Sequence, residues 1–271
     1  MIKLEHTVLP SSEQMQFVIE GMRNPMNSWD KSDSVNCDTE CAICKYDFSS
    51  DCKKASWLIP NFGLGTNDHS LMKKLSQAGT DHRKYMRMMP VYVRITAPLY
   101  WWKEFDTYKV GTVANSCSTM HKIQEKEFTL EDFSVEHLRE VTSSHNIEMT
   151  GAKAERLRKE KSIEAPIAMC DMQPIDILQL TIDALNVYRN LYLETKNKVW
   201  WWQMIQLLPS SYNQTRNVML NYEVLSNMYH SRKNHKLDEW REFCKWIEEL
   251  PYSELIIGEE VSSADNFDVR R

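Results

Sequence analysis

The chain has 271 residues, enough for one large domain or two small ones with a sizeable apolar core. Its formal net charge of −5 argues against a protein that binds nucleic-acid polymers, because such proteins usually carry a basic surplus. No apolar run approaches the roughly 18 residues of a membrane span, and no signal-peptide pattern is present. We therefore expect a cytoplasmic protein with no membrane partner.

The first part of the chain predicts short elements around a polar excursion. Residues 2–9 alternate weakly and suit a strand, and Ser11 begins a capping-box pattern for a helix that runs to about residue 22. A Cys-rich irregular excursion follows at about 30–56. Asn67 and Asp68 are expected to cap a helix over 70–77, which Gly79 ends. Residues 91–95 predict a strand, and Pro98 suits the first turn of the next helix.

The second part is predicted to be mainly helical. Helices are expected over 129–145, 174–196, 199–207, 213–231 and 237–250. The fourth of these depends on Val218, Tyr222, Leu225 and Tyr229, which recur at helical spacing. Strands early and long helices late indicate an α+β fold, and we expect one domain over residues 1–271.

Residues 82–120 run from His82, through an expected strand and Ala97-Pro98, into Thr107-Tyr108-Lys109, a spacing that resembles the flavin-dependent thymidylate synthases. That family runs from a histidine beside the flavin, through a strand and an Ala-Pro, into Arg-His-Arg-x-x-Ser-x-Asn-Glu. Here the histidine is His82, the Ala-Pro is Ala97-Pro98, and Thr107-Tyr108-Lys109 stands where Arg-His-Arg is expected. In a register shifted by one residue, Asn115 and Ser118 align with the family's asparagine and second serine.

A second block, residues 208–232, carries the same resemblance. The family's Leu-Pro is followed twelve residues later by Asn-x-Arg-x-x-x-Asn-x-x-x-x-Arg. Leu208-Pro209 leads here to Asn221, Glu223, Asn227 and Arg232, so three of the four polar positions match and Glu223 reverses a charge. The two blocks occur in the family's order, and together they indicate a diverged member of that family.

The resemblance implies a fold, a reaction and partners. The fold would be a curved, mostly antiparallel sheet flanked by long helices, assembled as a homotetramer. The reaction would be C5 methylation, or a diverged hydroxymethylation, of a pyrimidine deoxynucleoside monophosphate of the dUMP type. FAD would carry hydride, methylenetetrahydrofolate would supply the carbon and NADPH would be the reductant, while the protein supplies orientation and charge.

The resemblance also implies roles for individual residues. Arg232 would hold the nucleotide and stabilise charge on its ring, because a guanidinium is a planar fork of donors. Tyr108 and Lys109 would act in catalysis and contact the cofactor. The other expected contacts are His82, Asn221 and Asn227 for FAD, and Asn115 and Ser118 for the nucleotide. The bland alternatives are ordinary polar residues of helices and loops.

Several departures from the motif leave the reaction open. Lys109 keeps a positive charge but loses the planar fork, and Tyr108 cannot carry the charge. Glu223 would repel a pyrophosphate where the family has an arginine. Lost phosphate contacts could be offset by Arg94, Lys103, Lys122, Arg216 or Lys233. The alternative reading is a catalytically decayed nucleotide-binding or structural protein of the same fold.

The cysteines offer a separate possibility. Cys37, Cys41, Cys44 and Cys52 place four thiols within sixteen residues, enough to close a tetrahedral zinc site. Reactive redox thiols and unrelated reduced thiols are the alternatives, since a chain of this kind is expected in a reducing compartment. The runs Trp101-Trp102 and Trp200-Trp201-Trp202 point in different directions on helices, so they predict packing rather than a cofactor box.

Overall fold

The computed structural model describes residues 2–36, 58–139 and 173–258. Contacts divide them into two compact units, which are described separately here. The sheet unit holds residues 2–97, 101–117 and 215 onward, and the hairpin unit holds residues 98–100 and 118–214. The expectation of a single domain stays a prediction.

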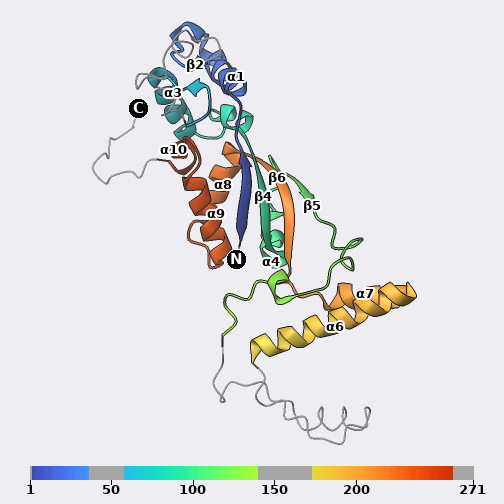
Figure 1. Cartoon of the computed structure of the whole chain (residues 1–271). Helices are drawn as coiled ribbons and strands as arrows, with labels where there is room; N and C mark the ends of the chain where they lie inside the picture. The colour runs from blue at the N-terminus through green and yellow to red at the C-terminus, as the bar shows by residue number, and fades with distance from the viewer. Residues whose placement is uncertain (1, 37–57, 140–172, 259–271) are drawn as a thin grey trace, which may run out of the picture. The chain divides into compact units, whose positions relative to one another are not determined.

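A four-stranded sheet organises the sheet unit. Its strands are β1 (Lys3–Val8), β4 (Pro90–Pro98), β5 (Val113–Ser116) and β6 (Asn213–Asn221), in the order β1-β4-β6-β5 (Figure 1). β1 runs antiparallel to β4, and β5 runs antiparallel to β6. A second, two-stranded sheet pairs β2 (Val35–Asn36) with β3 (Phe62–Gly63). This α+β architecture with an antiparallel sheet confirms the predicted fold class.

Alternation along the two central strands gives the large sheet one buried face. Val91, Val93 and Ile95 of β4 are buried, as are Val218 and Leu220 of β6. Helices α8 (Tyr222–Arg232), α9 (Asp238–Glu248) and α10 (Glu254–Ile257) lie along one side of the sheet in Figure 1. Burial of β-branched residues at every second position is what drives a half-buried strand onto a core.

Aromatic rings form the centre of the sheet unit's core. The ring of Trp101 contacts those of Trp102, Phe105, Trp240 and Phe243, with centroids 4.8 to 5.7 Å apart. Three of these rings belong to α4 (Leu99–Phe105) and two to α9. The Trp101-Trp102 pair is therefore packing, as predicted, and it fixes α4 against α9.

The sheet unit also contains helices and 3₁₀ turns in its N-terminal part. They are α1 (Ser12–Arg23), α3 (Thr66–Gln77) and the 3₁₀ turns η1 (Asn24–Met26), η2 (Trp29–Lys31) and η4 (Lys84–Met88). The capping box predicted at Ser11 is present, because Ser11 Oγ accepts from the amide of Gln14 at 3.2 Å and Gln14 Oε1 accepts from the amide of Ser11 at 2.9 Å.

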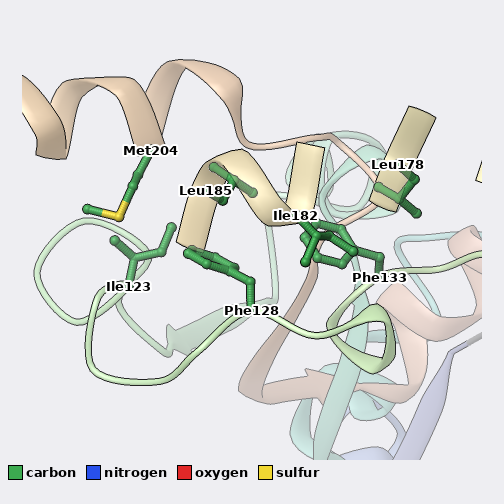
Figure 2. Packing of buried hydrophobic residues seen from close by; sticks show 7 residues of the cluster. All are labelled: Ile123, Phe128, Phe133, Leu178, Ile182, Leu185 and Met204. Carbon is green, nitrogen blue, oxygen red and sulfur yellow. The ribbon is translucent and has the colours of Figure 1, made fainter. Parts of the chain in front are cut away.

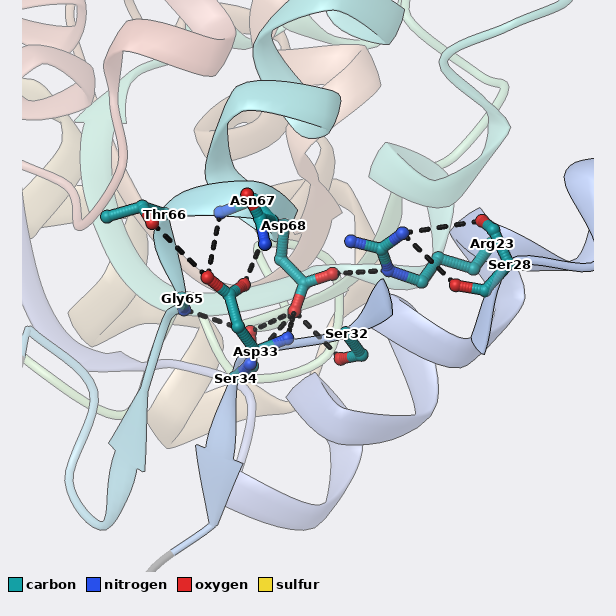
Figure 3. Close-up of polar contacts among 9 residues, drawn as sticks. All are labelled: Arg23, Ser28, Ser32, Asp33, Ser34, Gly65, Thr66, Asn67 and Asp68. Atoms are coloured by element: carbon teal, nitrogen blue, oxygen red, sulfur yellow. Dashed lines mark hydrogen bonds and ion pairs between the residues drawn. The ribbon is translucent and has the colours of Figure 1, made fainter. Parts of the chain in front are cut away.

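A buried polar network, the Asp68 latch, joins α1 to the start of α3. Asp68 Oδ1 accepts from Arg23 Nε at 2.5 Å, and Asp68 Oδ2 accepts from the hydroxyls of Ser32 and Ser34 and from two backbone amides (Figure 3). The side chain of Asp68 is 0% exposed. Burial opposes its ionisation, but the hydrogen bonds from Ser34, Ser32 and Arg23 outweigh burial and lower the pKa of Asp68.

Asp33 completes the latch by capping α3 from a distant segment. Its Oδ2 and Oδ1 accept from the amides of Asn67 and Asp68 at 3.0 and 3.1 Å. The predicted cap was wrong, because Asn67 and Asp68 lie inside the first turn of α3 and Gly65 is the N-cap. Gly65 is required there, since a Cβ would lie 2.0 Å from Asp33 Oδ1. Short-range patterns could not reveal a cap supplied from another part of the chain.

The hairpin unit is built on two successive helices. α6 (Pro174–Thr195) and α7 (Lys198–Leu207) are joined by a turn in which Lys196 adopts φ 53°. Their buried side chains pack with Ile123, Phe128 and Phe133 into a core of its own (Figure 2). Both helices match the predicted spans to within two residues. Trp200 stacks on Tyr188 with centroids 5.9 Å apart, so it too serves packing.

Two predicted helices were wrong. Residues 213–231 form strand β6 followed by α8, with a boundary at Asn221, because Gln214, Val218 and Leu220 alternate to one buried face. The predicted helix over 129–145 is a single 3₁₀ turn, η5 (Leu130–Asp132), as far as residue 139, beyond which it lies outside the described residues. Within the described residues, no helix is long and apolar enough to cross a membrane.

Candidate functional site

Five polar and aromatic side chains from different segments meet at the C-terminal end of α8, and we call them the Arg232 cluster. It consists of Glu104, Tyr108, Arg232, His235 and Trp240. Arg232 Nε donates to Tyr108 Oη at 2.9 Å, and Arg232 Nη1 donates to Glu104 Oε2 at 2.7 Å. The guanidinium also lies over the ring of Trp240, 4.8 Å from its centroid. The structure thus brings together two of the predicted site residues, Arg232 and Tyr108.

One oxygen of Glu104 organises this cluster. Besides Arg232, Glu104 Oε2 accepts from Trp240 Nε1 at 2.9 Å and lies 3.4 Å from His235 Nε2. The amide of Leu237 donates to His235 Nδ1 at 3.2 Å, so the proton of a neutral His235 is on Nε2, facing Glu104. Trp240 is fully buried, and a buried indole N–H needs an acceptor. Glu104 therefore serves both the core and Arg232.

Arg232 is held rigidly without being enclosed. Its side chain is 19% exposed, and no described residue accepts a hydrogen bond from its Nη2. A guanidinium fixed by two hydrogen bonds and a ring loses little conformational entropy when it binds a ligand. Nη2 is therefore a preorganised donor for an oxygen or a ring nitrogen.

A second ionic group, the Glu223 cluster, lies at the start of α8. Arg87 binds the carboxylate of Glu223 through both Nε and Nη2, and Arg83 Nε lies 3.5 Å from Glu223 Oε1. Arg83 Nη2 also donates to Asn227 Oδ1 at 3.1 Å. The hydrogen bond and charge of Glu223 raise the pKa of Arg87. Two guanidiniums thus lie against the carboxylate of Glu223, and the charge of Asp81 also acts on Arg87.

This arrangement changes the reading of the charge reversal at Glu223. Taken alone, Glu223 would repel a pyrophosphate, but Arg87 of η4 and Arg83, which directly precedes η4, offset its charge. The donor set therefore fits an anionic cofactor. Neither arginine was among the residues expected to offset lost cations, because the sequence does not show that η4 meets α8.

Asn221 has a structural role. Its Oδ1 accepts from the amide of Val224 at 2.9 Å and so caps α8. A Cβ on Gly111, whose φ is +81°, would lie 2.7 Å from Asn221 Nδ2. Asn221 thus fixes the junction of β6 with α8 against the loop that follows Tyr108. The expectation that Asn221 and Asn227 share one helix was wrong, since Asn221 ends the strand.

The remaining predicted residues do not join the Arg232 cluster. Lys109 and His82 are exposed loop residues. Asn115 lies on β5 opposite Asn217 of β6, beside a cavity of about 370 Å³ on the exposed side of the sheet. Ser118 belongs to the hairpin unit, where its Oγ accepts from the amide of His121 at 2.9 Å. Their roles stay predictions.

The proposed zinc ligands, Cys37, Cys41, Cys44 and Cys52, lie outside the described residues. Among the residues that are described, no group of three or more His, Cys, Asp or Glu side chains could hold a metal ion. The zinc site stays a prediction from spacing.

Sequence reasoning missed Glu104, Trp240, Arg83 and Arg87, and it noted His235 only as part of a basic loop over residues 232–236 that could attract an anionic nucleotide. Glu104 precedes Tyr108 by four residues, which is helical spacing for two side chains on one face, so it offered a weak signal. His235 and Trp240 follow Arg232 closely along the chain. The two η4 arginines gave no local signal, because their partner is more than 130 residues away.

Comparison with solved structures supports the fold. No protein-family model matches the sequence, and no curated protein matches it. The flavin-dependent thymidylate synthase ThyX from Helicobacter pylori, complexed with FAD and dUMP, aligns with a TM-score of 0.52 and 14% identity over 94% of this chain and 95% of that one. A second structure of the Helicobacter pylori enzyme with FAD and dUMP gives 0.51 and 16% over 94% of each chain. The chain therefore has the fold of the flavin-dependent thymidylate synthases.

Proposed function

We propose that the protein modifies the ring of a pyrimidine deoxynucleoside monophosphate, with Arg232 as the residue that holds the base. The observation that carries this proposal is the state of Arg232. Tyr108, Glu104 and Trp240 fix its guanidinium, yet Nη2 is left without a partner among the described residues. The solved structures of the same fold from Helicobacter pylori contain dUMP, which supports a nucleotide ligand.

The chemistry assigned to Arg232 follows from what ring modification requires. Carbon 5 of a pyrimidine becomes strongly nucleophilic when the ring carries an enolate-like negative charge, which is shared between C5 and an exocyclic oxygen. A fixed donor aimed at that oxygen stabilises the charged state without reorganising. Arg232 is already oriented by Tyr108, so no binding energy is spent on ordering it.

The proposed cofactor is FAD, with methylenetetrahydrofolate and NADPH as co-substrates. When bound, FAD would supply hydride transfer to the one-carbon unit. Arg83 and Arg87 would hold its anionic part, and Asn227 orients Arg83 through the 3.1 Å hydrogen bond. Methylenetetrahydrofolate would supply the carbon at the formaldehyde level, so a methyl product would need that hydride and a hydroxymethyl product would need water in its place.

We also propose a homotetramer. The exposed side of the large sheet carries three large apolar residues, Val8, Tyr92 and Val113, which are 56%, 45% and 62% exposed. Val8 pairs with Tyr92 across β1 and β4. Apolar side chains gathered on an exposed sheet face are typical of an association surface. The mass of the purified protein in solution tests this directly.

The competing function is a nucleotide-binding protein of the same fold that has lost catalysis. The ion pair between Arg232 and Glu104 favours it, because a neutralised guanidinium stabilises developing charge less well. Colour and ligand binding separate the two. An active enzyme should purify yellow, and FAD followed by dUMP or dCMP should each raise the melting temperature, since a ligand that binds only the folded state stabilises it.

The outcome is decided by the two ligands together. A colourless protein that FAD does not stabilise, but that a nucleotide does, would support the binding protein and reject the enzyme. A protein that neither FAD nor any pyrimidine nucleotide stabilises would reject both. Turnover of nucleotide in the presence of methylenetetrahydrofolate and NADPH would establish the enzyme.

A further inference from the structure

Two hydrogen-bonding atoms of the Arg232 cluster have no partner among the described residues. Glu104 Oε2 receives Arg232, Trp240 and His235, but nothing described donates to Glu104 Oε1. On the guanidinium side, Nε and Nη1 are used and Nη2 is not. The side chains of Glu104 and Arg232 are 35% and 19% exposed, so neither is enclosed by the protein, and the 2.7 Å bond between Nη1 and Oε2 keeps the two side chains adjacent.

These atoms offer an acceptor beside a donor. A carboxylate paired with a guanidinium accepts hydrogen bonds and donates none, whereas Nη2 donates and accepts none. A ligand that satisfies both must present a donor next to an acceptor along one edge. Two pyrimidines have this feature: cytosine offers its 4-amino group next to N3, and uracil offers N3–H between two carbonyl oxygens.

The charges distinguish the two bases. On uracil, a carboxylate that accepts from N3–H lies beside the lone pairs of both O2 and O4, and Arg232 can offset the repulsion on one side only. On cytosine, the carboxylate faces the amino group, and the guanidinium faces N3 and O2, so every neighbouring contact is attractive. Accepting from the cytosine amino group is also the usual way in which a glutamate reads a base.

The rest of the cluster keeps Glu104 an acceptor. His235 turns its Nε2–H toward the carboxylate, because the amide of Leu237 occupies Nδ1. The indole N–H of Trp240 also points at Glu104 Oε2. Both groups lie against Oε2 and fix the orientation of the carboxylate, so Oε1 is held in one position from which it can select the ligand.

We propose that Glu104 is the residue that determines base specificity and that the base is cytosine, so that the nucleotide is a cytidine nucleotide such as dCMP. This inference rests on the proposed function, in which Arg232 holds the pyrimidine. The proposal names cytosine as the base, which neither the sequence motifs nor the solved structures of the same fold indicate.

The test measures the affinities of dCMP, dUMP and deoxyribose 5-phosphate by calorimetry with the full chain. The wild-type protein should bind dCMP roughly tenfold or more tightly than dUMP, the scale of discrimination given by a good pair of contacts to a base. Deoxyribose 5-phosphate, which lacks a base, should bind more weakly than dCMP.

Glu104→Gln tests whether Glu104 causes this preference. A glutamine amide can donate to O4 of uracil or accept from the amino group of cytosine, so the preference should fall to within about threefold. Asp106→Asn is the matched control, because Asp106 follows α4 and pairs with Arg216 rather than Arg232. It should leave the ratio unchanged. Glu104→Gln should still bind dUMP more tightly than deoxyribose 5-phosphate, which a variant that had lost its fold would not do.

Tighter binding of dUMP than of dCMP to the wild-type protein would overturn this inference and leave the proposed function standing. An unchanged ratio in Glu104→Gln would also overturn it. If neither nucleotide binds more tightly than deoxyribose 5-phosphate, the inference and the proposed function both fall.

Discussion

The Asp68 latch and the Arg232 cluster use the same ionic chemistry for different ends. In the latch, both oxygens of Asp68 are filled by donors, and Arg23 and Asp68 are almost completely buried. In the Arg232 cluster, Glu104 Oε2 accepts every hydrogen bond made to that carboxylate, and within the described part of the chain Glu104 Oε1 and Arg232 Nη2 have no partner. Complete satisfaction contributes stability, whereas incomplete satisfaction at a rigid, partly exposed site provides binding capacity.

The largest expected effect is on the latch. Asp68→Ala should lower the free energy of unfolding by about 3 to 5 kcal/mol, because it leaves the buried Arg23 without its charge partner. Denaturation by urea measures this, and the exposed Asp30 provides a control, Asp30→Ala, that should change it by less than about 0.5 kcal/mol. Equal losses of unfolding free energy in the two variants would show that the latch stabilises the fold no more than an exposed carboxylate does.

Arg232→Ala should weaken nucleotide binding rather than the stability of the fold. Nucleotide affinity should fall by about 1.5 to 3 kcal/mol, the scale of a hydrogen bond to a charged group, while the assembly state stays the same. Arg232→Lys should recover little of the loss, since an ammonium cannot bond Tyr108 and Glu104 as the planar fork does. Calorimetric titration with dCMP and dUMP gives the measurement. Wild-type affinity in Arg232→Ala would refute the site.

The Glu223 cluster lies between these two cases. Its carboxylate is filled by Arg87, yet Arg83 brings a further charge. Glu223→Gln should lower the free energy of unfolding by about 1 kcal/mol, because one of its charged bonds is replaced by a neutral one. The same change removes the negative charge near both arginines, so inorganic pyrophosphate should bind more tightly.

Glu242→Gln is the control for that variant, since Glu242 is an exposed residue of α9 whose partner is Lys245. It should alter neither stability nor pyrophosphate affinity. Pyrophosphate binding that is identical in wild-type protein and Glu223→Gln would mean that Arg83 and Arg87 do not face an anion.

The sequence predicted the parts of the fold that depend on local patterns. The helices over α6, α7 and α9, the strand β4 and the capping box at Ser11 all have signals within a few residues. β6 was misread because Val218 and Tyr222 also fit a helical period, and only pairing with β4 and β5 favours the extended form. Tertiary contacts decided between two periods that local sequence allowed.

The site was predictable only where the motif supplied it. Arg232 and Tyr108 were expected together, and the structure joins them by a hydrogen bond. Glu104 gave only the weak signal of its spacing from Tyr108, because its partners Arg232 and Trp240 lie more than 120 residues further along the chain. Arg87 was missed for the same reason. Charge partners are set by the packing of distant segments.

The smallest expected effect concerns acid and distinguishes the latch from the cluster once more. Hydrogen bonds lower the pKa of Asp68 below its ordinary value of 3.8. A carboxyl group whose pKa is lower in the folded protein contributes stability above the pKa of the unfolded state, and that stability is lost as the pH falls through the folded-state value. The difference in unfolding free energy between wild type and Asp68→Asn should therefore be constant near neutrality.

That difference should shrink only below about pH 4, by about 1.4 kcal/mol for each unit by which folding lowers the pKa. Denaturation curves for both proteins at a series of acidic pH values measure it. Burial opposes the ionisation of Asp33, but its hydrogen bonds from the backbone amides of Asn67 and Asp68 lower its pKa. The difference in unfolding free energy between wild type and Asp33→Asn should therefore shrink over the same pH range. A difference that persists unchanged into acid would show that the latch stabilises through packing of Asp68 rather than through its charge.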